Sequence, residues 1–233
     1  MKLYSYWKSS ASWRVRIALG LKELDFELVS VDLRGGAQTE ELHLARNPLA
    51  QVPVLALADG RLVSQSMAIF DYLEAVHPAP SLYPCDPHDR ARAIQLAEAV
   101  NAGIQPLQNL ATRLRVTETA DPVAWCRHFV GRGLQALEAM ASTCPGRFLV
   151  GDHPTVADLC LVPQLESARG FGLDPADFPT LSRVESTCGA LPAFRAARPE
   201  AQPDAPRRSI PTRSNHVQVP RPPAHRLTSL LRS

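Results

Sequence analysis

Hydroxyl and basic side chains gather near the start of the chain, where a strand is expected to give way to a helix. Residues 8–19 read KSSASWRVRIAL and follow an apolar-alternating segment at residues 3–7. A helix N-terminus carries unpaired backbone N–H groups and the positive end of the helix dipole, which favour a bound anion. A serine hydroxyl placed there can donate a hydrogen bond to a thiolate or a carboxylate. The pattern predicts a site for a small anionic ligand, whereas on the alternative interpretation Ser9 and Ser10 only cap the helix.

Two further polar motifs precede helical patterns. Gln65 and Ser66 open one helix, and the Ser66 hydroxyl with the nearby N–H groups suits a carboxylate, although a simple cap would look the same. Thr155 and Asp158 form a capping-type box before an apolar run, with Asp in place of Glu or Gln. We interpret this box as structural and assign it no catalytic role.

The elements that must position these groups form an α/β unit over residues 1–78. Period-two and helical patterns alternate in the order βαβαββα, which predicts a mixed sheet. The Asp59-Gly60 pair between two short apolar runs is a hairpin signal. The expected strands and helices cover Lys2–Trp7, Ser12–Leu21, Phe26–Val31, Thr39–Arg46, Val54–Leu57, Leu62–Val63 and Ser66–Val76.

A proline-rich linker then leads into an all-helical domain over residues 88–204. Four prolines fall within His77–Asp89. Helical periodicity follows at about 88–116, 122–143, 155–168 and 180–197, with an interruption before Pro192. Residues 205–233 are rich in proline and arginine, and we predict a disordered tail there.

Composition restricts the class of protein. The net charge is +2, but residues 201–233 hold six arginines and one aspartate, so the first 200 residues sum to −3 and nucleic-acid binding is not expected. No apolar run approaches the ~18 residues of a membrane span, and no signal peptide is apparent, which predicts a cytoplasmic protein without membrane contact. The five cysteines form no C-x-x-C pair, so free thiols are expected, and the histidines show no metal-ligand spacing.

Five segments in order resemble the zeta class of glutathione transferases, the family that includes maleylacetoacetate isomerase, over roughly residues 1–204. They are SSASWRVRIAL at 9–19, QVP at 51–53, QSMAI at 65–69, GIQPLQNL at 103–110 and GDHPTVADLCLVPQ at 151–164. One departure stands out, because the zeta signature usually has a cysteine where this chain has Ala11.

The resemblance implies a thioredoxin-like domain followed by an all-α domain, a homodimer, and glutathione as cofactor. It implies that Ser9 and Ser10 are catalytic, that the Val52–Pro53 bond is cis, and that Arg169 and, with less weight, Lys8 bind a substrate carboxylate. We also expect one of Arg14 and Arg16 to form a structural ion pair. The residues that the resemblance assigns to glutathione are Ser9, Ser10, Ala11, Ser12, Trp13, Arg14, Gln38, Val52, Pro53, Gln65, Ser66, Gln105 and Asn109.

The activity implied by the resemblance is glutathione-dependent cis–trans isomerisation of maleylacetoacetate or maleylpyruvate, steps of tyrosine and phenylalanine or of gentisate breakdown. The GIQPLQNL segment favours maleylacetoacetate. Two alternatives stay open: a transferase that conjugates or dehalogenates small α-halo acids, and a non-catalytic glutathione-binding adaptor, for which Ala11 and the unusual tail are the only support.

Overall fold

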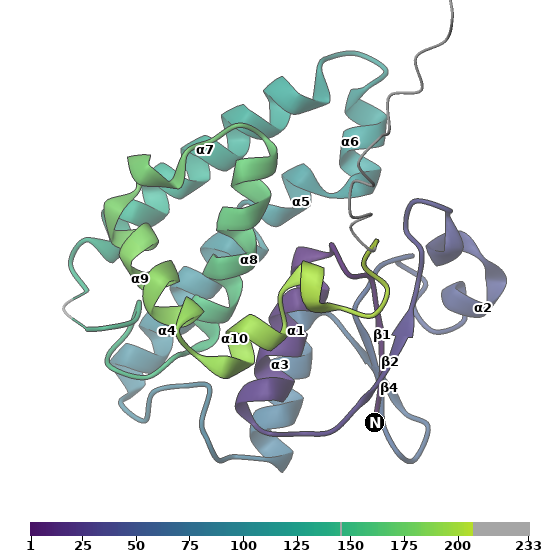
Figure 1. Cartoon of the computed structure of the whole chain (residues 1–233), viewed down its shortest axis with the longest axis horizontal. Helices are drawn as coiled ribbons and strands as arrows, with labels where there is room; N and C mark the ends of the chain where they lie inside the picture. The colour runs from purple at the N-terminus through teal and green to yellow at the C-terminus, as the bar shows by residue number, and fades with distance from the viewer. Residues whose placement is uncertain (145, 207–233) are drawn as a thin grey trace, which may run out of the picture.

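A mixed sheet with its helices lies beside a larger group of helices, as Figure 1 shows. The computed structural model describes residues 1–144 and 146–206. The tail predicted at 205–233 therefore lies outside the described residues from position 207 onward. The α/β part followed by a helical part confirms the predicted fold class.

The sheet has the strand order β2-β1-β3-β4. Its strands are β1 (Lys2–Ser5), β2 (Glu27–Ser30), β3 (Val54–Ala56) and β4 (Leu62–Ser64). β1 pairs in parallel with β2, so that Ser5 lies opposite Ser30, and antiparallel with β3, so that Tyr4 lies opposite Val54. β3 and β4 form the expected hairpin, and the turn places Gly60 at a φ of 86°, a conformation that glycine adopts easily. Because β1 and β2 are parallel, the carboxyl ends of both strands lie at the same end of the sheet.

Helices of the α/β part are α1 (Ser10–Leu21), η1 (Ala37–Thr39), α2 (Glu41–Leu44) and α3 (Ser66–Val76). The single helix predicted over Thr39–Arg46 is divided, because Glu40 has extended backbone angles. α1 is buried along most of its length, since it packs against α3 and also against two helices of the other part, α8 (Val156–Gly170) and α10 (Pro192–Ala196). The helix that begins at the serines is therefore held by both parts of the molecule.

The helical part also contains α4 (Pro87–Asn101), α5 (Gln105–Gln108), α6 (Leu110–Val116), α7 (Pro122–Ala141), η2 (Pro175–Asp177), α9 (Pro179–Gly189) and η3 (Pro199–Ala201). The prediction of one helix over 88–116 is wrong, because α4 ends at Asn101 and two short helices follow. A side chain at Gly103 would approach the Ala99 carbonyl oxygen to 2.5 Å, and Asn109 begins α6 as its N-cap. The break expected before Pro192 is present between α9 and α10.

The linker between the two parts is fastened by Lys22. Its buried ammonium group donates to the Glu74 carboxylate at 2.9 Å and to the carbonyl oxygens of His77 and Pro80 at 2.6 and 2.9 Å. One apolar core runs from Leu3 of β1 to Phe194 of α10. The domain boundaries predicted at 1–78 and 88–204 stay a prediction. No helix within the described residues has the length and apolar character needed to cross a membrane.

Candidate active site

The serine turn, residues 6–10, connects β1 to α1. Ser9 is the N-cap of α1, and its Oγ accepts a hydrogen bond from the Ser12 N–H at 3.2 Å. The Ser9 N–H donates to the Tyr6 carbonyl oxygen at 3.0 Å, which closes the turn. Ser9 and Ser10 are half-buried, so both remain accessible from outside. A capping hydroxyl that accepts from the helix still has its own proton to donate to a ligand.

The residues just after the turn lie behind it. Ser12, Trp13 and Arg14 are buried, with Arg14 fully so, whereas Ala11 is half-buried. Within the described part of the chain, Ser12 Oγ, Trp13 Nε1 and two nitrogens of Arg14 are buried without a hydrogen-bond partner. Any contact of these three side chains with a ligand would come from beneath the turn. Their predicted roles in glutathione binding stay predictions.

A second candidate anion site lies at the start of α3. Ser66 is 3% exposed, and its Oγ accepts from Arg14 Nη1 at 3.3 Å. The same nitrogen donates to Asn101 Oδ1 at 2.8 Å, and the amide nitrogen of Asn101 lies 3.2 Å from the nearer carboxylate oxygen of Glu98. Arg14 thus places a buried positive charge behind the helix N-terminus. Gln65, before Ser66, has a φ of 70° and its Nε2 lies 3.4 Å from Gln51 Oε1.

The loop before β3 lies next to the serine turn. The Val52–Pro53 peptide bond is cis, as expected. Val52 packs with Tyr6 of the turn and with Val31 in one small apolar cluster. The carbonyl oxygen of Gln51 accepts from His43 and Asn47, which holds the loop. The structure therefore brings together the serine turn and the Val52–Pro53 loop, whose neighbour Gln51 contacts the start of α3.

The other amides predicted to contact a ligand have mixed surroundings. Gln38, in η1, is half-buried, and its Oε1 is buried with no hydrogen-bond partner within the described residues. Asn109 Oδ1 accepts from the Ala111 N–H at 3.3 Å as the cap of α6, and Gln105 is half-buried at the start of α5. Sequence reasoning missed Gln108, which exchanges two hydrogen bonds, 3.0 and 2.9 Å long, with buried Gln164 of α8. Nothing in the local sequence around Gln108, which was predicted to lie within one helix over 88–116, indicated that its amide would face another amide.

The two cations predicted to bind substrate differ in their surroundings. Lys8 is exposed, lies beside Ser9 in the chain, and forms no ion pair with the described residues. Arg169 donates to both carboxylate oxygens of Glu185, at 2.8 and 2.5 Å, and to Glu166 at 3.2 Å. These hydrogen bonds and the two negative charges raise the pKa of Arg169. No hydrogen bond or ion pair within the described residues joins Arg169 to the serine turn, and its predicted role stays a prediction.

Neither Arg14 nor Arg16 forms an ion pair within 4 Å among the described residues, contrary to the expectation for one of them. Arg16 instead donates to the Tyr6 and Trp7 carbonyl oxygens of the serine turn, among other acceptors. Burial lowers its pKa to about 10, and the charge of Asp204 opposes this effect.

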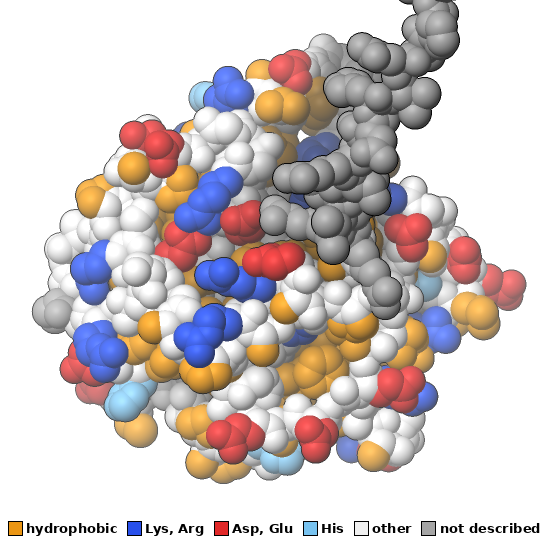
Figure 2. Space-filling model, viewed as in Figure 1, with side chains coloured by type: hydrophobic (Ala, Val, Ile, Leu, Met, Phe, Trp, Pro, Cys, Tyr) orange, Lys and Arg blue, Asp and Glu red, His pale blue; other side chains and the backbone are white. Residues whose placement is uncertain are grey.

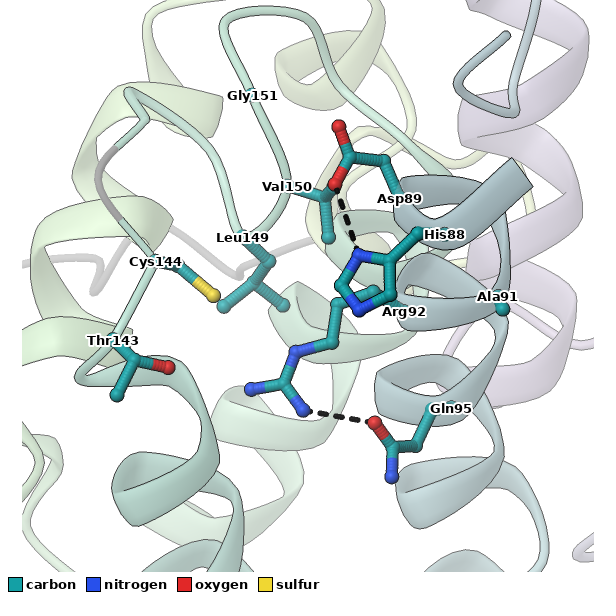
Figure 3. Close-up of a pocket in the computed structure, with 10 residues that line it drawn as sticks. All are labelled: His88, Asp89, Ala91, Arg92, Gln95, Thr143, Cys144, Leu149, Val150 and Gly151. Atoms are coloured by element: carbon teal, nitrogen blue, oxygen red, sulfur yellow. Dashed lines mark hydrogen bonds and ion pairs between the residues drawn. The ribbon is translucent and has the colours of Figure 1, made fainter. Parts of the chain in front are cut away.

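A cleft of about 770 Å³ lies elsewhere, between the start of α4, the residues 143–144 that follow α7, and residues 149–151. Figure 3 shows a hydrogen bond from Arg92 of α4 to Gln95, and His88 lies beside Asp89. Cys144 lies across the cleft from these residues. The cleft shares no lining residue with the predicted site.

On the face in Figure 2, acidic and basic side chains of the described residues are interspersed.

Comparison with known proteins matches residues 1–75 to the N-terminal domain of glutathione S-transferases and residues 126–192 to their C-terminal domain. Maleylacetoacetate isomerase of Mus musculus is 42% identical over 88% of this chain and 94% of the mouse protein. Maleylacetoacetate isomerase of Anaeromyxobacter dehalogenans 2CP-1, solved with bound glutathione and with dicarboxyethyl glutathione and citrate, is 50% identical with a TM-score of 0.81, over 88% of this chain and 97% of that one. A bacterial zeta-class maleylpyruvate isomerase is 41% identical with a TM-score of 0.84, over 88% and 100%.

Proposed function

This chain belongs to the glutathione S-transferase family, among the zeta-class members, and on that premise we propose that it is a glutathione-dependent cis–trans isomerase of maleylacetoacetate or maleylpyruvate. The observation that carries the proposal is the placement of the Ser9 hydroxyl at the N-terminus of α1, where it caps the helix and stays accessible. The relatives solved with glutathione support the choice of cofactor.

The residues present fit the tripeptide. Its three charged or reactive groups are a thiol, a γ-glutamyl carboxylate and a glycyl carboxylate. The serine turn offers a hydroxyl and a helix N-terminus for the sulfur. The start of α3 offers Ser66 with buried Arg14 behind it, which suits the γ-glutamyl carboxylate. Gln38, whose buried Oε1 has no partner within the described residues, is our candidate for the glycyl end.

When bound, glutathione supplies a thiolate that adds reversibly to the cis double bond, so that the bond becomes single, rotates, and re-forms as trans when the thiolate is expelled. The protein favours the thiolate because Ser9 donates a hydrogen bond and the dipole of α1 points its positive end at the sulfur. Ser10 adds a second hydroxyl in the same turn. The hydroxyl hydrogen bonds and the helix dipole lower the pKa of a bound thiol, which is otherwise mostly protonated at neutral pH.

The remaining predicted residues would orient the ligands. The backbone of Val52, before Pro53, can pair with the cysteinyl unit of the tripeptide, while Gln65 extends the γ-glutamyl site. Gln105 and Asn109 lie at the α5–α6 junction, which we place over the cofactor. Lys8 is the cation nearest to Ser9 in the chain, and we propose that it attracts the carboxylate of the substrate. Arg169, whose guanidinium already donates to Glu185 and Glu166, is the second candidate for that role.

We further propose that the protein is a cytoplasmic homodimer that acts in tyrosine and phenylalanine breakdown. The α/β part exposes large apolar side chains, with Leu42 71% and Leu49 61% exposed, and a partner subunit could cover them. All five cysteines are free, which is usual in a reducing compartment.

The test is a glutathione-dependent isomerisation assay on maleylacetone, with a dichlorinated two-carbon acid as the competing substrate. We expect isomerisation to exceed dehalogenation. We also expect Ser9→Ala to lower kcat/KM by about a hundredfold, the usual loss for one donor to a developing anion, and Ser10→Ala to lower it less. Isomerisation absent beside active dehalogenation would favour the halo-acid transferase. Glutathione binding without either reaction would favour the adaptor.

A further inference from the structure

We propose that Asp204, near the end of the described chain, is a positioning residue that fixes the serine turn from outside and so sets the Ser9 hydroxyl against the cofactor sulfur. This inference rests on the function proposed above. Asp204 belongs to the segment that follows α10, which crosses α1 and reaches the ends of β1 and β2 (Figure 1).

The contact is made to the backbone of the turn itself. Asp204 Oδ2 accepts from the Trp7 N–H at 2.9 Å and from Ser30 Oγ at 3.0 Å. Ser30 ends β2 and lies opposite Ser5, the last residue of β1. One carboxylate oxygen therefore joins the strand end to the peptide that lies two residues before Ser9.

Arg16 holds the two carbonyl groups that flank the Trp7 N–H in the chain. Its Nη2 donates to the Trp7 carbonyl oxygen at 3.0 Å, and its Nη1 lies 3.4 Å from the Tyr6 carbonyl oxygen and 3.1 Å from Ser5 Oγ. Its Nε donates to the carbonyl oxygen of Ala197, at the end of α10. The side chain of Arg16 is 3% exposed, and Asp204 is the negative charge that acts on it most directly. The Trp7 N–H is thus bound by Asp204, and the Tyr6 and Trp7 carbonyl oxygens are bound by Arg16.

These constraints reach Ser9 through a short path. The Tyr6 carbonyl oxygen that Arg16 contacts also accepts from the Ser9 N–H at 3.0 Å. The position of Ser9 therefore depends on the orientation of the Tyr6–Trp7 peptide, whose carbonyl oxygen accepts the Ser9 hydrogen bond. Hydrogen bonds to a charged group are stronger than neutral ones, so loss of the Asp204 carboxylate should loosen the Trp7 peptide. A displaced hydroxyl would stabilise a thiolate less, because this stabilisation depends on donor geometry.

The segment that carries Asp204 is well fastened, so the carboxylate is held rather than free. α10 lies close to α1, where a side chain at Gly20 would approach Ala193 Cβ to 3.3 Å. Gln202 donates to the carbonyl oxygens of Ala196 and Arg198, both at 2.9 Å. These bonds fold residues 196–205 back toward the sheet.

The experiment measures the pKa of the enzyme-bound glutathione thiol from the ultraviolet absorbance of the thiolate, together with kcat, KM and the unfolding midpoint, in the full-length protein. Asp204→Ala should raise the bound-thiol pKa and lower kcat by about five- to tenfold, less than the hundredfold loss that a 1 Å displacement can cause. Asp204→Asn should restore most of the activity, because its amide oxygen can accept from the same two donors. The matched control is Asp174→Ala, which removes a carboxylate that accepts from a backbone N–H (Ala176, 2.9 Å) at η2.

An unchanged bound-thiol pKa and kcat in Asp204→Ala would overturn the inference, even if the unfolding midpoint fell. Should Asp204→Ala fail to fold, Asp204→Glu keeps the charge but displaces it, and a bound-thiol pKa equal to that of the wild type would count equally against the inference. A wild-type protein that does not bind glutathione would instead refute the proposed function. The two failures are therefore distinguishable.

Discussion

Arg14 Nη1 lies 3.3 Å from Ser66 Oγ, so α1 supplies a fully buried positive charge to the first residue of α3. α1 thereby serves two candidate anion sites, one at its own N-terminus and one through this guanidinium. The relation allows the two sites to be tested separately.

Ser66→Ala should raise the KM for glutathione by about tenfold or more and leave kcat nearly unchanged, because a hydrogen bond to a charged group contributes about 1.5–3 kcal/mol. The γ-glutamyl carboxylate is remote from the reacting sulfur. Loss of the Ser66 hydrogen bond to it therefore weakens glutathione binding equally in the ground state and in the transition state. Steady-state kinetics at varied glutathione measure this. Ser167→Ala is the control, since among the described residues the Ser167 hydroxyl donates only to the Pro163 carbonyl oxygen within α8. A fall in kcat with KM unchanged would contradict the assignment.

Lys8→Gln should raise the KM for the isomerised substrate by about two- to fivefold, in the range of one exposed charge interaction, without changing the KM for glutathione. Arg169→Gln should have a smaller effect on this KM, because Glu185 and Glu166 already engage the guanidinium. The comparison of the two variants at low and at high salt checks the electrostatic origin. A larger rise for Arg169→Gln would show that Arg169 exchanges Glu185 for the substrate.

Alkylation of the native protein with iodoacetamide at neutral pH should leave its activity intact. Burial raises the pKa of the Cys126 thiol, that of Cys160 to about 11, and that of Cys188 still further, so these thiols are poor nucleophiles. Only Cys85 is exposed and Cys144 half-buried, and neither belongs to the serine turn.

Intact-mass measurement should therefore find at most two labels on each native chain. Ala11→Cys, which restores the usual zeta residue, is the matched variant. It should take one further label, and glutathione should slow that reaction. Loss of wild-type activity on alkylation would contradict the prediction.

Asp158 should be the most important cap of the helical part. The fully buried carboxylate accepts from the Leu149 N–H at 2.9 Å and from the N–H and hydroxyl of Thr155 at 2.8 and 3.0 Å. Asp158→Asn should lower the free energy of unfolding by about 2–4 kcal/mol, because an amide nitrogen cannot accept these bonds. Denaturant unfolding measures the loss. Asp121→Asn, at the exposed cap of α7, should cost about 1 kcal/mol or less.

The stability contributed by Asp158 should also depend on pH. Burial raises the pKa of Asp158 to about 6 from an ordinary 3.8, although its hydrogen bonds oppose the rise. Between these values the folded protein binds more protons at this residue than the unfolded chain does, so this contribution to the free energy of unfolding decreases as pH rises from about 4 to about 6. The advantage of the wild type over Asp158→Asn should be larger at pH 4 than at pH 7. An advantage that grows with pH would contradict this sign.

Local sequence patterns predicted the sheet and most of the helices because alternation, helical periodicity and capping residues act over a few neighbouring positions. The same locality explains the error over residues 88–116. Apolar periodicity continues through this stretch, while Gly103 and the Asn109 cap end one helix and begin another. The candidate glutathione residues were accessible to sequence reasoning only through a family resemblance, since Ser9 and Ser66 look like ordinary caps by themselves.

Contacts between distant residues had no local signal. Nothing near Arg169 in the sequence indicated that Glu185, sixteen residues later, would engage it. The Gln108–Gln164 pair and the contact between Trp7 and Asp204 join positions 56 and 197 residues apart. Such pairs depend on how elements distant in the sequence pack together, which local residue patterns do not encode.

The bond between Trp7 and Asp204 also imposes an order on synthesis. A ribosome adds the carboxylate that fastens the serine turn 197 positions after it has made Trp7. A nascent chain can thus complete its sheet, which ends at Ser64, long before the final anchor emerges, whereas the last core residues, Phe194 and Ala197, precede the anchor only shortly. Translation that stops a few codons before residue 204 would release a protein that folds yet holds its reactive sulfur loosely.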